Sequence, residues 1–339
     1  TYGSKYANSI FSFSEFDNPI GNIKFNIIPH TWDGNRCKYC GASKSEYDRR
    51  EDLETHAYEF IHRKKTEEIF NMKFDVIIGN PPYQLSTGGT KSQATPIYNK
   101  FVEQAKKLKP RYLVMIIPSR WFAGGMGLSE FRRDMLNDTS LKEMVDYTNA
   151  KDCFPGISLG GGVNYFLWDR DYSGPCNYTN IHDGIMNTKQ RTLNEYEVFI
   201  RFNEGYEIIK KVKSLGEKTM DKLVSSLSPF GLNSSERGRK TMENRDLVLY
   251  SSGGKGYINK NNVTKGTNYI GKYNIMMSKT TSEHAGEPDK DGKFKVISKI
   301  QILKPSEVCT FSYFLIGNDS NENNIENMYN YLSTKFARF

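Results

Sequence analysis

Hydrophobic residues recur along the first half of the chain in two patterns, continuous apolar runs and apolar positions spaced three or four residues apart. Residues 74–79 form a β-branched apolar run that stops at two prolines. Proline cannot donate a ladder hydrogen bond, so this run predicts a buried strand with an abrupt carboxyl end. Residues 97–108 have helical spacing, and residues 112–117 form a second apolar run before Pro118. This order predicts a βαβ unit.

The alternation continues with a predicted helix at residues 128–136 and predicted strands at 141–147 and 162–169. Apolar strands that alternate with amphipathic helices are typical of an α/β protein whose parallel sheet is covered on both faces. The last two strands can instead pair as an antiparallel edge. In open sheets of this kind ligands bind beyond the carboxyl ends of the strands, so we expect chemistry at residues 80–83. The polar stretch 84–95 is predicted to be a mobile loop that covers that site.

The pattern changes near residue 170, where Asn, Ser, Gly, Lys and Tyr become frequent and apolar runs become short. We therefore predict a boundary between 170 and 200 and divide the chain into residues 1–175, an α/β domain, and residues 176–339, a mixed α+β domain. The second domain is predicted to contain a helix, short strands with turns, and one further strand, at residues 204–213, 247–275 and 308–316.

Two Gly-rich stretches, residues 160–162 and 253–256, are predicted to be tight turns. Neither has the strand–GxxxxGK[ST]–helix form of a phosphate loop. Pro175-Cys176 resembles the nucleophile of cytosine-C5 methyltransferases, but it lies in a Gly- and Asn-rich loop with no activating neighbour in the sequence. We expect no covalent catalysis there.

Composition places the chain among soluble proteins. Of its 339 residues 25% are charged, and no apolar run approaches the ~20 residues that a membrane helix needs, so we expect no membrane partner. Residue 1 is Thr, and the first residues lack the pattern of a secretory signal. Five cysteines at irregular spacing argue against a disulfide framework. These features predict a cytoplasmic protein.

The formal net charge of +8 is concentrated in one segment, residues 237–304, which has 14 Lys and Arg against 6 Asp and Glu. Such a segment is typical of a surface that binds nucleic-acid phosphates, although a solvated basic surface is the alternative. The candidate phosphate contacts are Arg237, Arg239, Lys240, Arg245, Lys255, Lys260 and Lys265.

A Cys-x2-Cys pair, Cys37 and Cys40, is followed by His56 and His62. The gaps of 2, 15 and 5 residues lie within the range of Cys2His2 zinc sites, which have a structural role. Against this, the two histidines lie in a helical pattern that places them about 240° apart around the axis, and the cysteines can be two reduced thiols. The sequence leaves both interpretations open for a small Cys/His insertion at residues 30–62.

Asn80-Pro81-Pro82-Tyr83 after an apolar strand resembles the catalytic motif of amino-group DNA methyltransferases, and Asn in first position resembles the adenine-N6 class. Other stretches look like the adenine methyltransferases of type II restriction-modification systems, namely residues 96–98, 115–122, 152–155, 161–168 and 331–339. The resemblance implies a partial Rossmann-like sheet and a target-recognition domain. It also implies S-adenosylmethionine as cofactor, double-stranded DNA as partner, and an association with an endonuclease module or subunit.

The residues of the motif suit this chemistry. The Asn80 side-chain oxygen and the Pro81 carbonyl can accept the two N–H groups of an exocyclic amine, and Pro82 helps to fix that carbonyl. Tyr83 can stack on a base that has left the duplex, with Trp121 or Phe122 as a second wall. The resemblance places Asn80 and Pro82 on the cofactor side of the site.

One departure from the family concerns the region before the motif. Members carry a Gly-containing cofactor loop and an acidic partner upstream, and residues 1–73 show no such unit. We therefore expect a fragment, with the C-terminal part of a catalytic domain and a truncated recognition domain, that is inactive alone. Two alternatives are cytosine-N4 transfer and a non-catalytic DNA-binding specificity module.

Overall fold

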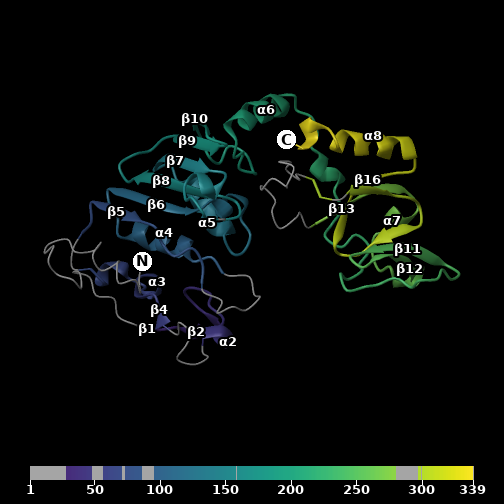
Figure 1. Cartoon of the computed structure of the whole chain (residues 1–339), viewed down its shortest axis with the longest axis horizontal. Coiled ribbons are helices and arrows are strands. Elements are labelled where there is room, and N and C mark those ends of the chain that lie inside the picture. Colours follow the sequence, from purple (N-terminus) through teal and green to yellow (C-terminus); the bar gives the residue numbers. More distant parts are fainter. Residues whose placement is uncertain are drawn as a thin grey trace. The chain divides into compact units, whose positions relative to one another are not determined.

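The computed structural model describes residues 28–47, 56–70, 73–85, 95–157, 159–279, 297–298 and 300–338. The chain divides into two compact units, residues 1–206 and residues 207–339, which are described separately (Figure 1). Helix α6 (Asn203–Ser214) contains the point of division. Within the described ranges no helix is both long enough and apolar enough to span a bilayer.

The first unit is built on a six-stranded sheet with the order β10-β9-β7-β8-β6-β5. Its strands are β5 (Val76–Gly79), β6 (Tyr112–Pro118), β7 (Leu141–Tyr147), β8 (Val163–Asp169), β9 (Cys176–His182) and β10 (Ile185–Arg191). The α/β class is confirmed, but the sheet is mixed: β5 and β6 run parallel, as do β7 and β9, and the other pairs are antiparallel. Between β7 and β8 the described chain has only the short helix η3 (Ala150–Asp152), so no crossover helix makes the pair parallel.

The first unit extends to Tyr206, whereas the sequence predicted a division after residue 175. The difference arises because β9 and β10 form a hairpin that pairs with β7 and completes the first sheet. Tyr178 of β9 is fully buried in the core, and the polar Thr179 and Asn180 of the same strand are also buried. The polar composition of β9 and β10 therefore led the sequence analysis to predict a domain boundary before them.

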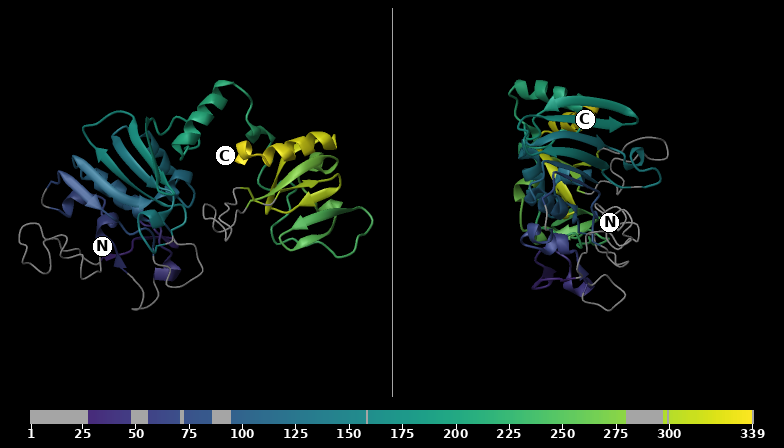
Figure 2. Two further views of the ribbon diagram at one scale, coloured as in Figure 1. Left: turned by 45° about the horizontal axis from the view of Figure 1, so that its top comes forward. Right: turned by 90° about the vertical axis from the view of Figure 1, so that its left-hand side faces the viewer.

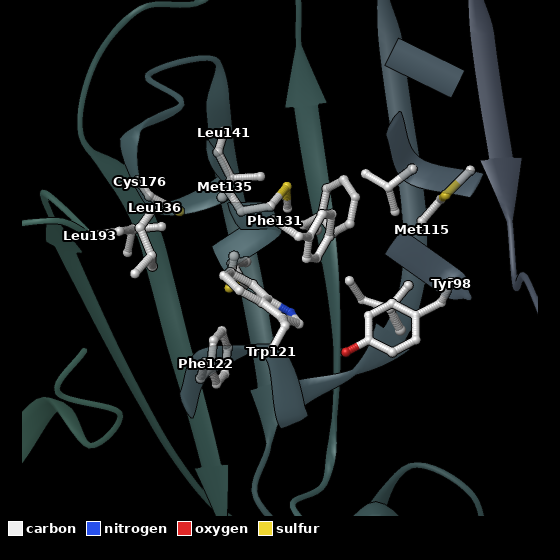
Figure 3. Close-up of a cluster of buried hydrophobic side chains, with 14 of the residues drawn as sticks. Tyr98, Met115, Trp121, Phe122, Phe131, Met135, Leu136, Leu141, Cys176 and Leu193 are labelled. Carbon is white, nitrogen blue, oxygen red and sulfur yellow. The ribbon is translucent and has the colours of Figure 1, made fainter. Parts of the chain in front are cut away.

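Two helices, α4 (Tyr98–Lys107) and α5 (Ser129–Asn137), and the short helix η2 (Ser119–Ala123) pack with the sheet to form the main core. Figure 3 shows its side chains, among them Phe131 and Met135 of α5 with Met115 of β6. On the opposite face of the sheet the side chains of Val76 and Ile78 are 49% and 75% exposed. The expected cover on both faces is therefore not present at this end of the sheet among the described residues.

A small Cys/His module, residues 28–47 and 56–62, lies next to this core. It comprises β1 (Ile28–Pro29), β2 (Trp32–Asp33), β3 (Arg36–Cys37), α2 (Lys44–Tyr47), β4 (His56–Ala57) and α3 (Glu59–His62), and η1 (Thr66–Glu68) follows it. The sequence predicted one helix through both His56 and His62. The structure instead pairs the backbone of His56 with Pro29 in a two-stranded ladder, and the helix begins only at Glu59.

The second unit contains two three-stranded sheets, seen with helix α8 in Figure 2. The first consists of β12 (Gly254–Asn259), β11 (Asp246–Ser251) and β15 (Glu307–Cys309), and the second of β14 (Ile300–Leu303), β13 (Tyr273–Ser278) and β16 (Tyr313–Asp319). The helices are η4 (Met220–Leu223), η5 (Lys260–Asn262), α7 (Thr267–Ile270), α8 (Glu322–Leu332) and α9 (Lys335–Arg338). The strand predicted at 308–316 is two strands, because β15 and β16 belong to different sheets.

Candidate active site

The Asn80–Tyr83 segment leaves the sheet directly beyond the carboxyl end of β5. Asn80 is exposed and Pro81 is buried. The Tyr83 carbonyl accepts a hydrogen bond from the Ile97 amide at 3.1 Å, and the Leu85 amide donates to the Thr95 carbonyl at 3.0 Å. These bonds join the segment to the start of α4. Most of the loop predicted at 84–95 lies outside the described residues.

Tyr83 stands half-buried with its phenol oxygen in the interior. Burial raises the pKa of Tyr83 to about 12, and the nearby Cys153 thiol adds to the shift. The phenol is therefore neutral at physiological pH. Cys153 belongs to the stretch after β7 that resembles the methyltransferases, so two stretches singled out in the sequence meet here. Tyr147 and Tyr165 also approach each other, with ring centroids 6.4 Å apart.

Trp121 and Phe122 lie in the hydrophobic core and not on the surface of a base-binding pocket (Figure 3). Trp121 is fully buried, with ring centroids 4.5 Å from Phe122 and 5.7 Å from Phe131. Phe122 in turn contacts Phe199, at 4.7 Å. A ring that stacks on a base needs one free face, and Trp121 has none. Their expected role in base stacking is corrected to core packing, and Tyr83 is left as the aromatic candidate.

A buried polar network, which sequence reasoning missed, is centred on Asp146 of β7. Arg201 donates to both carboxylate oxygens, from Nε at 2.5 Å and from Nη2 at 2.8 Å. The Ser119 hydroxyl donates to Oδ1 at 2.6 Å and the Tyr178 phenol to Oδ2 at 3.1 Å. The Asn164 amide extends the network to Ser119 at 3.1 Å. Burial alone would lower the pKa of Arg201, but its hydrogen bonds and attraction to Asp146 raise it above the usual value.

Two polar residues at strand positions that face the core, Asp146 and Asn164, were the available signal for this network. Strand residues that are polar and face the core require partners. The network lies where β6 ends and β8 begins, because the Ser119 amide donates to the Gly162 carbonyl at 3.0 Å. Gly162 has φ of +77°, and a Cβ there would lie 2.1 Å from the Tyr147 carbonyl. The tight turn predicted at residues 160–162 is therefore confirmed.

The Cys/His module brings together four side chains, and they differ from the predicted set. Ligand-type atoms of His30, Cys37, Cys40 and His62 all lie within 4.8 Å of one another, and all four residues are buried. His30 is the member that the sequence analysis did not name, and the side chain of His56 lies outside the described part of the structure. His30 directly follows Pro29, whose pairing with β4 brings these segments together. A histidine seven residues before Cys37 was the unused signal.

The basic residues predicted to contact phosphates are not equivalent. Arg239 donates to both carboxylate oxygens of the buried Asp246 at 2.6 Å and lies 3.1 Å from Glu243, so its charge is neutralised. Arg237 donates to the backbone carbonyls of Ser234 and Glu236, and no carboxylate of the described residues pairs with its charge. The remaining five are exposed, namely Lys240, Arg245, Lys255, Lys260 and Lys265. Arg239 is exposed but paired with two carboxylates, so its contact with phosphate stays a prediction.

Comparison with known proteins connects the first unit to restriction-modification enzymes. Residues 4–154 match the Eco57I restriction-modification methylase family. An uncharacterized adenine-specific methylase of Mycoplasma pneumoniae is 37% identical over 183 residues, which are 51% of this chain and 43% of that protein. The chain thus spans less than half the length of this curated relative. The family resemblance noted in the sequence is confirmed.

Solved structures with local similarity come from the same class of enzymes. The Type IIL restriction-modification enzyme MmeI in complex with DNA is 7% identical, with a TM-score of 0.38 over 78% of this chain and 43% of that chain. A modification subunit of a putative type I restriction enzyme from Vibrio vulnificus YJ016 is 11% identical, with a TM-score of 0.26 over 45% of this chain and 35% of that chain.

Proposed function

We propose that this chain, whose residues 4–154 match the Eco57I restriction-modification methylases, is part of a site-specific DNA methyltransferase that transfers a methyl group from S-adenosylmethionine to adenine N6. The observation that carries the proposal is the placement of the Asn80–Tyr83 segment. It directly follows the edge strand β5, presents an exposed Asn80 amide, and is anchored by the Tyr83 carbonyl to the start of α4.

The segment can activate an exocyclic amine. The amine lone pair is delocalised into the base, and acceptors aimed at both N–H bonds favour a pyramidal nitrogen with a localised lone pair. The Asn80 side-chain oxygen and the Pro81 carbonyl are the two acceptors, and buried Pro81 holds its carbonyl rigidly. The neutral ring of Tyr83 stacks on a base extruded from the duplex.

Bound S-adenosylmethionine supplies an electrophilic methyl group, and Asn80 and Pro82 are the residues assigned to its side of the site. Among the described residues β5 pairs only with β6, and its apolar Val76 and Ile78 side chains are exposed. The edge position of β5 supports pairing with a further strand, and its exposed apolar face supports cover by a further helix. We therefore assign the rest of the cofactor pocket to segments outside the described residues. Because residues 1–73 show no Gly-containing cofactor loop in the sequence, we expect residues 1–339 alone to be inactive.

The test uses the full-length protein with S-adenosylmethionine labelled in the methyl group and duplex DNA. Label is expected in DNA, and digestion to nucleosides is expected to yield N6-methyladenine. N4-methylcytosine would instead assign the enzyme to the cytosine-N4 class, because the same two acceptors suit either amine. A full-length protein that binds DNA but incorporates no label would identify a non-catalytic specificity module. Residues 1–339 assayed in parallel test the inactivity of this part.

We further propose that the exposed cations of the β11–β12 hairpin contact double-stranded DNA in a target-recognition domain. Two of them are neighbours, because the Lys260 amide donates to the Arg245 carbonyl at 3.1 Å. A double substitution, Lys255→Ala with Lys260→Ala, is expected to weaken DNA binding and to reduce the slope of log K against log salt by about two. Lys222→Ala, which removes an exposed lysine paired with Asp221, is the control. An unchanged slope in the double variant would place the DNA surface elsewhere.

A further inference from the structure

We propose that His30, Cys37, Cys40 and His62 bind a structural zinc ion, which holds the Cys/His module against the segment that follows the candidate active site. The four ligands come from separate places: His30 follows β1, Cys37 ends β3, Cys40 lies in the next turn, and His62 ends α3. Each is at most 8% exposed. A fold that buries four such side chains around one point gives them a common function.

The distances suit a tetrahedral site. Zinc bonds of about 2.3 Å to sulfur and about 2.0–2.1 Å to nitrogen separate a sulfur and a nitrogen ligand by roughly 3.6 Å in a regular tetrahedron. Cys37 Sγ lies 3.4 Å from His62 Nε2, and Cys40 Sγ lies 3.5 Å from His30 Nδ1. All four atoms lie within 4.8 Å of one another, so small adjustments suffice to close the site.

Neighbouring backbone groups orient the ligands as they do around structural metals. His62 Nδ1 lies 2.8 Å from the Tyr58 carbonyl, which can only accept a hydrogen bond. Nδ1 therefore carries the proton, and the lone pair of Nε2 is directed at Cys37 Sγ. The Ala42 backbone N–H forms a hydrogen bond with Cys40, and the Gly41 amide donates to the Cys37 carbonyl at 2.9 Å. This turn directs the sulfur atoms of Cys37 and Cys40 toward the two histidines.

The alternative is a metal-free cluster held by two thiol–imidazole hydrogen bonds. The module is a poor candidate for stability without a metal, because each of its described strands has two residues and each of its helices four. Modules this small usually need a metal or disulfides to offset chain entropy. Two thiolates and two imidazoles form a closed donor set with no open position for water. This set is typical of structural rather than catalytic zinc.

The site is coupled to the catalytic segment through packing. Cys37, Cys40 and Ile61 of the module share one apolar cluster with Leu85 and Ile97. Leu85 and Ile97 are the residues whose amides form the bonds at the base of the loop after Tyr83. Zinc would therefore help to position the Asn80–Tyr83 segment through Leu85 and Ile97. This inference rests on the proposed function of that segment.

The experiment measures the metal content of the full-length protein by mass spectrometry after purification without chelators. We expect about one zinc ion per chain. Cys37→Ser and His30→Ala are each expected to lose it, whereas Cys153→Ser and His56→Ala retain it. Cobalt exchanged into the wild-type protein is expected to give the absorption of a tetrahedral site with thiolate ligands, a readout that does not depend on activity or on the folding of a variant.

Wild-type protein that contains no zinc and gives no tetrahedral cobalt spectrum would overturn the proposal. Loss of zinc from His56→Ala with retention in His30→Ala would overturn the ligand assignment. Chelation is expected to lower the rate of methyl transfer, and an unchanged rate after complete zinc removal would overturn the coupling to the catalytic segment. A zinc-containing wild-type protein without methyl transfer would contradict the proposed function while supporting the zinc site.

Discussion

Asn80→Ala in the full-length protein is expected to lower the rate of methyl transfer by about 10²–10³-fold, the effect of removing one acceptor or donor aligned with a transition state. The Asn80 amide is exposed beyond the end of β5, so its removal leaves core packing intact. The loss should therefore fall on kcat, with little change in DNA affinity. The rate is measured with labelled methyl donor, and affinity by titration of duplex DNA.

Lys73→Ala is the matched control for Asn80→Ala. Lys73 is also exposed and precedes the same strand, at its opposite end. This variant is expected to transfer methyl groups at the wild-type rate. Transfer by Asn80→Ala within a few-fold of wild type would remove the segment from the mechanism. Loss of DNA binding together with activity would show that Asn80 acts in recognition instead.

Asp146→Ala is expected to lower the free energy of unfolding of the first unit by about 3–5 kcal/mol, the range for breaking a buried ion pair from one side. The carboxylate is fully buried and accepts two hydrogen bonds from Arg201. Its removal leaves that guanidinium without its counter-ion and deprives Ser119 and Tyr178 of their acceptor. Denaturant unfolding of the full-length protein, followed by a probe in the first unit, measures the change.

Asp134→Ala provides the comparison, since Asp134 pairs with Arg133 on the exposed surface of α5. Exposed pairs contribute at most about 1 kcal/mol, so this variant should unfold almost as the wild type does. Equal stability of the two variants would mean that the Asp146 network contributes little.

Gly162→Ala tests the network independently, because its Cβ would lie 2.1 Å from the Tyr147 carbonyl and 2.8 Å from Arg201 Nη2. Gly125, also at positive φ but with open space, is its control.

Local sequence patterns predicted several elements of the first unit and the candidate motif. The apolar runs at 74–79 and 112–117 correspond to β5 and β6, and the helical spacing at 97–108 corresponds to α4. These predictions succeeded because strand ends at proline and helical periodicity depend on neighbouring residues. The Asn80–Tyr83 motif was recognisable for the same reason, since its chemistry is carried by four consecutive residues.

Only the tertiary structure decided which distant residues meet. Pairing of β1 with β4 placed His30 beside the two cysteines, and packing against α5 placed Trp121 in the core. Both outcomes depend on packing between separate elements, and no local pattern specifies which elements pack together. The sequence by itself predicted the motif and its chemistry, and the fold decided its surroundings.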